Sequence, residues 1–472
     1  MFDPVIAPSG TLLGLLQRGR GDGTLHALAA PRAEALAALD HCVLNDPRHD
    51  WQVENRSLYY ARLYLDIHGG LDAIDDHLFR AEDHLDTDES RTGLALAVLG
   101  HLASYGRHDA LDLLRRYTAT GTNWAWALDE LALRDDDTGL RALATPVLAR
   151  FPATPDGDAE LASTVRDAFE PRPWRLWADD PRPAVGARIR AAGEQGSFDR
   201  WQRQMRPSGP RPGWSVQAVF DWAQQGLERG TELHLPAARC LTAVAGPGDR
   251  PLIVEAARGG PGGARCAALH YLAEARDPVV LDLIETAAGD PHRAVADAAV
   301  SAFERMCGDE AVDRARGWIH RPDALGASAA GVLACRGGTK DTPLVLGALR
   351  ETVRAEGPDS PRLWSLVDGA GRLGIVCAAP VLRHVYRETA SSQLRGRAAR
   401  ALAATDPSYA TGFAVECLWD CEETTREIGA LHAETGDVRV ADRLRRLAAD
   451  PAEEAEVQTA VRSRMGPDTA AR

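Results

Sequence analysis

The sequence lacks several features that would define a class of protein. It has one lysine, Lys340, and no run near the ~20 apolar residues of a membrane span, so we expect no membrane-spanning helix. Asp3 stands where a signal peptide carries positive charge, and the apolar run at 12–16 is short, which predicts a cytoplasmic protein. Its eight cysteines are scattered without a Cys-x-x-Cys motif, as expected of buried thiols in a reducing compartment.

Charge is distributed unevenly along the chain. The net charge is −14; residues 1–170 carry 15 arginines and 28 acidic residues, while residues 171–213 carry 9 arginines and 4 acidic residues. We call residues 171–213 the basic island. An acidic surface repels phosphate, so general nucleic-acid binding is disfavoured outside the island. The arginine-for-lysine bias itself fits a GC-rich genome better than a binding function.

Length and composition favour a repeat array. Hydrophobic residues make up 45% of the 472 residues and charged residues 26%, which is ordinary for a folded protein. The chain is too long for one globular core, yet it lacks the sharp breaks in composition that several unrelated domains would produce. Stacked copies of one small unit satisfy both observations.

Residues 264–306 contain such a unit and the start of its copy. After Asp277-Pro278 and again after Asp290-Pro291, apolar residues recur with helical spacing. Each aspartate can cap free N–H groups, and proline suits the first helical turn. The first stripe consists of Val279, Val280, Leu283, Ile284 and Ala287, and the second of Ala298, Ala299, Ala302, Phe303 and Met306. The unit is therefore predicted to be two short amphipathic helices.

The unit recurs with a spacing near 31 residues. First helices are expected near residues 237, 264, 295, 326, 363, 394 and 425, and a weaker pattern with starts near 57, 91 and 122 precedes the island. This predicts an all-α fold, an α-solenoid of stacked antiparallel helix pairs. The predicted domains are a helical array at 1–170, the island at 171–213 as an insertion or junction, a second array at 214–465 and a frayed tail at 466–472. Helices before the island are expected at 55–67, 71–81, 91–104, 108–117, 124–133, 139–151 and 158–169.

The segment RDPVVLDLIETAAGDPHRAVADAAVSAF resembles HEAT repeats of the short bacterial kind, also called phycobilisome-lyase-like HEAT repeats. The shared features are an Asp-Pro turn, an arginine, small residues on the first helix and a leucine-rich second helix. The resemblance covers residues 235–450 and, more weakly, 33–170. It implies a stacked helical array with a concave face for a protein partner, and it implies nothing about chemistry.

The basic island interrupts the repeat and holds the candidate partner-binding residues. Arginine and tryptophan are common at binding hot spots and could stack on bases or grip a peptide. Alternatively, the island folds back on the acidic amino-terminal array and buries its tryptophans there, an interpretation that the charge contrast favours. Short helices are predicted near 183–192 and 197–205. The candidates are Arg172, Trp174, Arg175, Trp177, Trp201 and Arg203.

Other motifs are interpreted as structural. A G-x-G-x-x-G run at 369–374 has no strand before it and falls where a helix should end. Residues 326–331 and 337–340 lack the spacing of a nucleophile elbow and of a phosphate loop. His84 with Asp88 could chelate a metal, but a solvated acidic face is the favoured interpretation of the acidic run at 75–89. Cys417 and Cys421 share a predicted helical face, but a metal would need two further ligands and none lies near in sequence. No catalytic residue, cofactor site or metal site is therefore predicted.

Three functions remain open from the sequence. The favoured one is a non-enzymatic scaffold or adaptor that holds a protein partner on a concave face formed by its second helices. The first alternative is an accessory subunit resembling those of bilin lyases. The second is a DNA-repair protein resembling the HEAT-like alkylpurine glycosylases, for which Trp174, Trp177 and Asp179 form the one local cluster of the right type. The acidic total charge counts against the second alternative, and the oligomeric state is left open.

Overall fold

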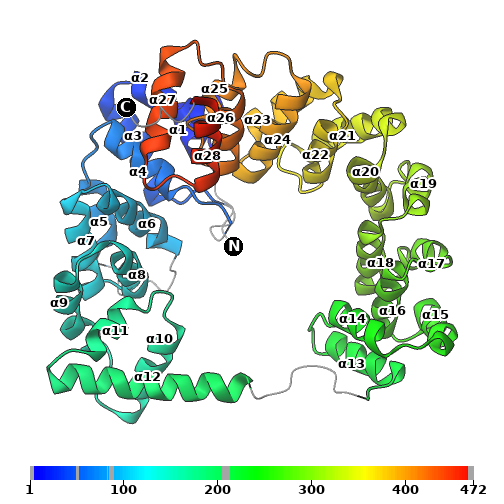
Figure 1. Cartoon of the computed structure of the whole chain (residues 1–472), viewed down its shortest axis with the longest axis horizontal. Coiled ribbons are helices and arrows are strands. Elements are labelled where there is room, and N and C mark those ends of the chain that lie inside the picture. Colours follow the sequence, from blue (N-terminus) through cyan, green and yellow to red (C-terminus); the bar gives the residue numbers. More distant parts are fainter. Residues whose placement is uncertain (1–4, 49–52, 82, 84–89, 205–212, 466–472) are drawn as a thin grey trace. The chain divides into compact units, whose positions relative to one another are not determined.

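The computed structural model describes residues 5–48, 53–81, 83, 90–204 and 213–465, without the side chains of residues 90 and 196–204. Over these residues the chain forms 28 α-helices and no β-strand (Figure 1). The predicted all-α class is therefore confirmed. Within the described part of the chain, no helix combines the length and apolarity needed to cross a membrane.

The chain divides into two compact units. Unit 1 comprises Met1–Pro207 together with Tyr386–Arg472, and unit 2 comprises Ser208–Val385. The first boundary falls inside the basic island, where the sequence predicts a junction. The second boundary falls within helix α23 (Ala379–Glu388) and corresponds to no predicted boundary. Unit 1 is thus assembled from both ends of the chain.

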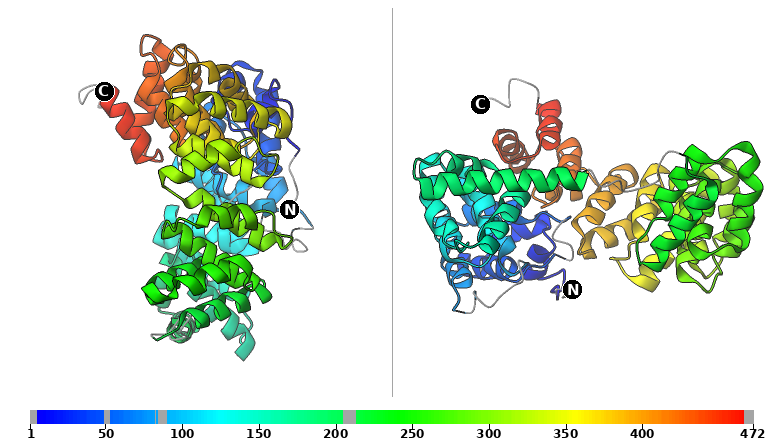
Figure 2. Two further views of the ribbon diagram at one scale, coloured as in Figure 1. Left: turned by 90° about the vertical axis from the view of Figure 1, so that its right-hand side faces the viewer. Right: turned by 90° about the horizontal axis from the view of Figure 1, so that it is seen from below.

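The helices of unit 1 reproduce the predicted pattern between residues 55 and 169 and differ from it on either side. Before residue 30, where no helix was predicted, the chain forms two helices, α1 and α2. In the island the two predicted short helices are one continuous helix, α12, which is preceded by an unpredicted helix, α11 (Figure 2, right). The helices are α1 (Leu12–Gln17), α2 (Gly21–Ala29), α3 (Arg32–Leu44), α4 (Ser57–Asp66), α5 (Asp72–Leu78), α6 (Ser90–Ser104), α7 (His108–Thr120), α8 (Trp124–Arg134), α9 (Asp137–Leu148), α10 (Pro155–Asp167), α11 (Arg172–Ala178), α12 (Pro183–Gln204), α24 (Ser392–Thr405), α25 (Phe413–Cys417), α26 (Glu423–His432), α27 (Val438–Ala449) and α28 (Ala455–Met465).

Unit 2 consists of helix pairs arranged in two layers. The helices α14, α16, α18, α20 and α22 form one layer, and each packs directly on the next (Figure 1). The second helices, α15, α17, α19 and α21, contact one another much less. The helices are α13 (Val216–Glu228), α14 (His234–Val244), α15 (Arg250–Gly259), α16 (Gly262–Glu274), α17 (Val280–Ala287), α18 (Arg293–Arg305), α19 (Asp309–Trp318), α20 (Ala324–Arg336), α21 (Thr342–Glu356) and α22 (Leu363–Arg372).

The close packing between the first helices of unit 2 depends on small residues. A Cβ at Gly369 of α22 would lie 2.6 Å from the Cβ of Ala334 in α20, so only glycine allows these helices to approach so closely. The first helices of unit 2 therefore form the more closely packed of its two layers.

Arginine–carboxylate pairs connect successive helix pairs. Arg250 of α15 donates to Asp277, with Nε 2.6 Å from Oδ2, and Arg265 of α16 pairs with Asp290. The two aspartates belong to the predicted Asp-Pro turns. Asp277 also accepts from the N–H of Val279 at 3.1 Å, and Asp290 accepts from the N–H of His292 at 2.8 Å. Each carboxylate therefore caps the turn that leads into the next helix and receives an arginine from the preceding pair.

Two histidines stack inside unit 2. The rings of His234 in α14 and His270 in α16 lie 5.2 Å apart between centroids and are inclined by 16°. His270 is buried, and its Nε2 has no hydrogen-bond partner among the described residues. Burial, together with the nearby His234 and Arg305, lowers the pKa of His270 to about 4. The pair is therefore neutral at physiological pH.

We expect the aromatic core of unit 1 to tolerate truncation poorly. Phe151 is 4% exposed and packs edge-to-face on Trp124, whereas Phe169 in the same unit is 83% exposed. Phe151→Ala should lower the free energy of unfolding by ~3–5 kcal/mol because it leaves a cavity. Phe169→Ala should change it by less than ~0.5 kcal/mol. Urea unfolding followed by circular dichroism measures both, and equal losses would contradict this packing.

Acid should destabilise unit 2 through His270. Because its pKa is lower in the folded state than in the unfolded state, the unfolded chain takes up the proton first as the pH falls. The contribution of His270 to the free energy of unfolding is fully present above pH ~6.5. It falls between pH ~6.5 and ~4 by up to ~1.4 kcal/mol per pH unit. His270→Leu should flatten this dependence in urea titrations performed at pH 7, 6, 5 and 4.5. An unchanged pH dependence would show that His270 is not the group responsible.

Candidate functional site

The basic island folds onto the amino-terminal helices of unit 1. Helix α12 packs along α10 and α11, and α11 also packs on α9. Thr154 caps α10 by accepting from the N–H of Gly157 at 3.2 Å, and Pro155 occupies the first turn. Asp180 accepts from the N–H of Arg182 at 2.9 Å and so fixes the turn between α11 and α12. These three helices, α10, α11 and α12, position the candidate residues.

The two island tryptophans of α11 lie in the core. Trp177 has 0% exposure, and its Nε1 donates to the carbonyl oxygen of Leu140 at 2.8 Å. Trp174 is 4% exposed and packs edge-to-face between Trp177 and Trp124, with centroid distances of 5.0 and 6.4 Å. Their indoles therefore attach the island to the amino-terminal helices, as the folding-back interpretation describes.

The island arginines have different surroundings. Arg172 donates to the carbonyl oxygens of Ala132 and Asp135 at 2.7 and 3.0 Å and forms an ion pair with Asp137, so it also holds the island in place. Arg175 is exposed, and its guanidinium makes no hydrogen bond or ion pair with any residue that the structure describes. The side chains of the remaining candidates, Trp201 and Arg203, lie outside the described residues.

A groove of about 660 Å³ opens between α10, α11 and α12. We call it the island groove. Its floor is apolar and buried or half-buried, and its rim is charged and mostly exposed. The floor is formed by Val165, Trp174, Ala178 and Ile189, and the rim by Arg166, Arg175, Arg190 and Glu194.

Two residues of this groove, Trp174 and Arg175, were candidates from the sequence, and the others were not. Arg190 and Ile189 belong to α12, and Arg166 belongs to α10. A helix was predicted at 183–192, but its packing against α10 was not. The available signal was the helical spacing of Val185, Ile189 and Ala192, which are all buried.

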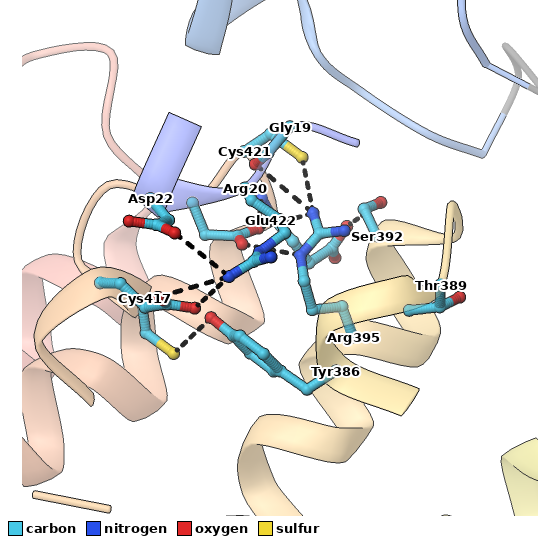
Figure 3. A network of polar contacts seen from close by, with 12 residues as sticks. Gly19, Arg20, Asp22, Tyr386, Thr389, Ser392, Arg395, Cys417, Cys421 and Glu422 are labelled. Atoms are coloured by element: carbon cyan, nitrogen blue, oxygen red, sulfur yellow. Dashed lines mark hydrogen bonds and ion pairs between the residues drawn. The ribbon is translucent and has the colours of Figure 1, made fainter. Parts of the chain in front are cut away.

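A second polar cluster connects the two ends of the chain within unit 1 (Figure 3). Arg395 of α24 and Asp420 are fully buried, with Nε 2.7 Å from Oδ2, and Arg395 also donates to the carbonyl oxygen of Gly19 at 3.4 Å. The N–H of Cys421 donates to the same carbonyl at 2.9 Å, and Arg20 pairs with Glu416 at 3.2 Å. Residues before α3 are therefore held against the turn that follows α25.

More arginines of the amino-terminal helices extend this cluster. Arg56, which is fully buried, binds Glu54 at 2.5 Å and the carbonyl oxygen of Ala390 at 2.8 Å. Arg62 of α4 pairs with Asp450 at 2.7 Å and with Glu453 at 3.1 Å. Burial opposes ionisation of Glu453, but the charges of Arg426 and Arg62 outweigh burial and lower its pKa. We call these buried ion pairs, with Arg395–Asp420, the end-to-end cluster.

The thiols of this region are not chemically activated. Burial raises the pKa of Cys417 and of Cys421 to about 12, so both stay protonated near neutral pH. The expectation that they share a helical face is wrong, because α25 ends at Cys417 and Cys421 lies in the following turn. The general expectation of buried thiols also fails at three exposed positions, Cys307, Cys335 and Cys377.

The remaining motifs have structural surroundings. Gly374 has a φ of 60° just after α22, and its N–H donates to the carbonyl oxygen of Gly371 at 3.0 Å, which confirms a helix end at the G-x-G-x-x-G run. Lys340 lies in the 3₁₀ turn Thr339–Asp341. Asp83 accepts from the Tyr117 hydroxyl at 3.1 Å. His84 and Asp88, the metal candidates, lie outside the described residues.

The cluster expected of a glycosylase-like protein is not arranged as a common surface. Trp177 of α11 is buried in the core, whereas Asp179, at the end of the same helix, is exposed. Only Trp174 of the three residues lines the island groove. No protein-family model matches the chain, and no curated protein matches its sequence. The function is therefore argued from the island groove and from the helix pairs.

We expect the docking of the amino-terminal helices to depend on glycine at position 21. A Cβ there would overlap the carbonyl oxygen of Glu416, whereas a Cβ at Gly10 meets no atom within 4 Å. Gly21→Ala should accelerate amide exchange in α1 at least about tenfold, equal to ~1.4 kcal/mol of opening free energy. Gly10→Ala is the matched control and should leave exchange unchanged. Unaltered exchange in Gly21→Ala would contradict the close contact.

Proposed function

We propose that this protein is an α-solenoid of HEAT-like helix pairs that acts as a non-enzymatic scaffold and binds a protein partner in the cytoplasm. The pairing of first and second helices and the stacking of each first helix on the next support the solenoid description. The eight free cysteines fit a reducing compartment. The resemblance to short bacterial HEAT repeats agrees with both points.

The island groove is the observation that carries the proposal. Protein-binding hot spots are enriched in arginine and lie in partly enclosed pockets. Here Arg175, whose side chain has no partner among the described residues, lies on the rim of an apolar groove. The groove walls are held by buried tryptophan packing and by the hydrogen bonds of Arg172, so a partner meets a preformed surface and little ordering entropy is lost on binding.

The most deeply buried polar groups support a binding role over a catalytic one. The end-to-end cluster matches its arginines with carboxylates, and such paired groups have little freedom to transfer protons. Cys417 contacts the hydroxyls of Tyr386 and Tyr409 at 3.3 and 3.5 Å and remains a thiol. These groups stabilise the fold, and the proposed function uses the exposed groove instead.

Filling the groove should abolish partner binding without unfolding the chain. Gly193 lines the groove, and a Cβ there meets no atom within 4 Å, so Gly193→Trp can place an indole in the open space. We expect the intact protein, captured from its own cells, to retain one protein in a fixed ratio through gel filtration. Gly193→Trp should reduce that retention at least about tenfold, equal to ~1.4 kcal/mol.

The control is another glycine-to-tryptophan substitution, placed in unit 2. Gly347→Trp, in α21, also places an indole where a Cβ meets no atom within 4 Å, and it should retain the partner fully. The complex should then form again from purified components. If the wild-type chain retains no protein, the scaffold proposal fails. If Gly193→Trp retains the partner as well as the wild type, the groove is not the site.

A further inference from the structure

We propose that the island groove binds an acidic segment of the partner, in which carboxylate side chains flank an apolar residue. This inference rests on the proposed scaffold function and specifies its ligand. It is carried by two rim arginines, Arg175 and Arg190, which form no ion pair with a described carboxylate and lie beside an apolar floor.

The apolar floor accommodates an apolar side chain. Trp174 and Ile189 are buried beneath the groove, and Val165 and Ala178 are half-buried beside them. A volume of about 660 Å³ lies within the range of ligand-binding clefts and holds a few side chains, but not a folded domain. A short segment that inserts one apolar residue covers the remaining exposed surface of Val165 and Ala178 and gains hydrophobic free energy.

The rim determines the charge of the segment. Arg175 has no partner among the described residues, and Arg190 donates to the carbonyl oxygen of Ala178 without a carboxylate. The third arginine, Arg166, is neutralised by Asp167, with Nη2 2.7 Å from Oδ2. Two guanidinium groups at the rim therefore form no ion pair with a described residue, and Glu194 is the one acidic side chain among the described residues that line the groove. Carboxylates of a partner can form bidentate bonds with them.

The same arginines do not make a nucleic-acid site. Base stacking requires an open aromatic face, but Trp174 is 4% exposed and its ring is packed between Trp124 and Trp177. A nucleic-acid strand would also extend its phosphates beyond the groove over residues 1–170, which carry a net charge of −13. A short acidic segment places its charges on the rim alone. The local geometry therefore favours a peptide.

The test is direct binding of defined probes to the full chain. The probes are a fluorescein-labelled 12-residue peptide of alternating glutamate and leucine, the same peptide with glutamine in place of glutamate, and a labelled 20-nucleotide oligo-dT. We expect the glutamate peptide to bind and the glutamine peptide to bind at least about tenfold more weakly. Binding of the glutamate peptide should weaken between 50 and 300 mM salt because the screening length becomes shorter.

Charge reversal locates the site. Arg175→Glu, and Arg175→Glu combined with Arg190→Glu, should weaken binding of the glutamate peptide at least about tenfold. The double change Arg293→Glu with Arg354→Glu alters the net charge equally in unit 2, at side chains that are 93% and 74% exposed, and should leave binding unchanged. Circular dichroism reports whether the double variant unfolds α12 by losing the Arg190 hydrogen bond. If it does, Arg175→Glu alone still tests the site.

Three results would overturn the inference: no binding of the glutamate peptide, equal binding by the charge-reversed chains, or tighter arginine-dependent binding of oligo-dT. Failure here is distinct from failure of the scaffold function. If a captured partner is lost on Gly193→Trp but retained by Arg175→Glu with Arg190→Glu, the groove is the binding site and its ligand is not acidic. If no partner is captured at all, the scaffold function itself fails.

Discussion

One contact recurs through this protein, the pair between an arginine of one helix and a carboxylate in the turn before a helix of the next pair. The partners lie 25 to 27 residues apart in sequence, as in Arg265–Asp290 and Arg395–Asp420. In unit 2 the arginines stay partly exposed, where such pairs stabilise by less than ~1 kcal/mol. At α24 to α28 the same contact is buried, and losing one partner there costs ~3–5 kcal/mol. The buried version holds only while the amino-terminal helices cover it.

That requirement explains why unit 1 is assembled from both ends of the chain. A short amphipathic helix pair cannot bury its apolar stripe without a neighbour, so the terminal pairs of an array need a cover. Here α1, α2 and α4 provide it for the helices after α23, through the backbone of Gly19 and the side chains of Arg56 and Arg62. The resulting cluster uses its titratable groups for folding.

In the basic island, several residues of the types that are common at binding sites are used for folding. Trp174, Trp177 and Arg172 have the chemistry of hot-spot residues, yet they are used to fix α11 on the amino-terminal helices. This packing leaves the Arg175 side chain at the edge of an apolar groove, with no ion pair or hydrogen bond to a described residue. The groove forms beside α11 because the tryptophans on one side of that helix pack into the core of unit 1. The same packing therefore fixes α11 as a wall of the groove and places the Arg175 guanidinium at its rim.

The sequence by itself determined the helices and their repeat. Stripes spaced by three and four residues predicted α4 to α10 and the pairs of unit 2, because local amphipathic periodicity is independent of distant contacts. It also indicated that the island packs on the acidic array, because the charge contrast was visible in composition. Tertiary structure alone decided that Gly19 and Cys421 meet, that α12 is continuous and that the side chain of Arg175, unlike that of Arg172, has no partner among the described residues. These outcomes depend on residues far apart in the chain finding space and partners together, and no local pattern encodes that.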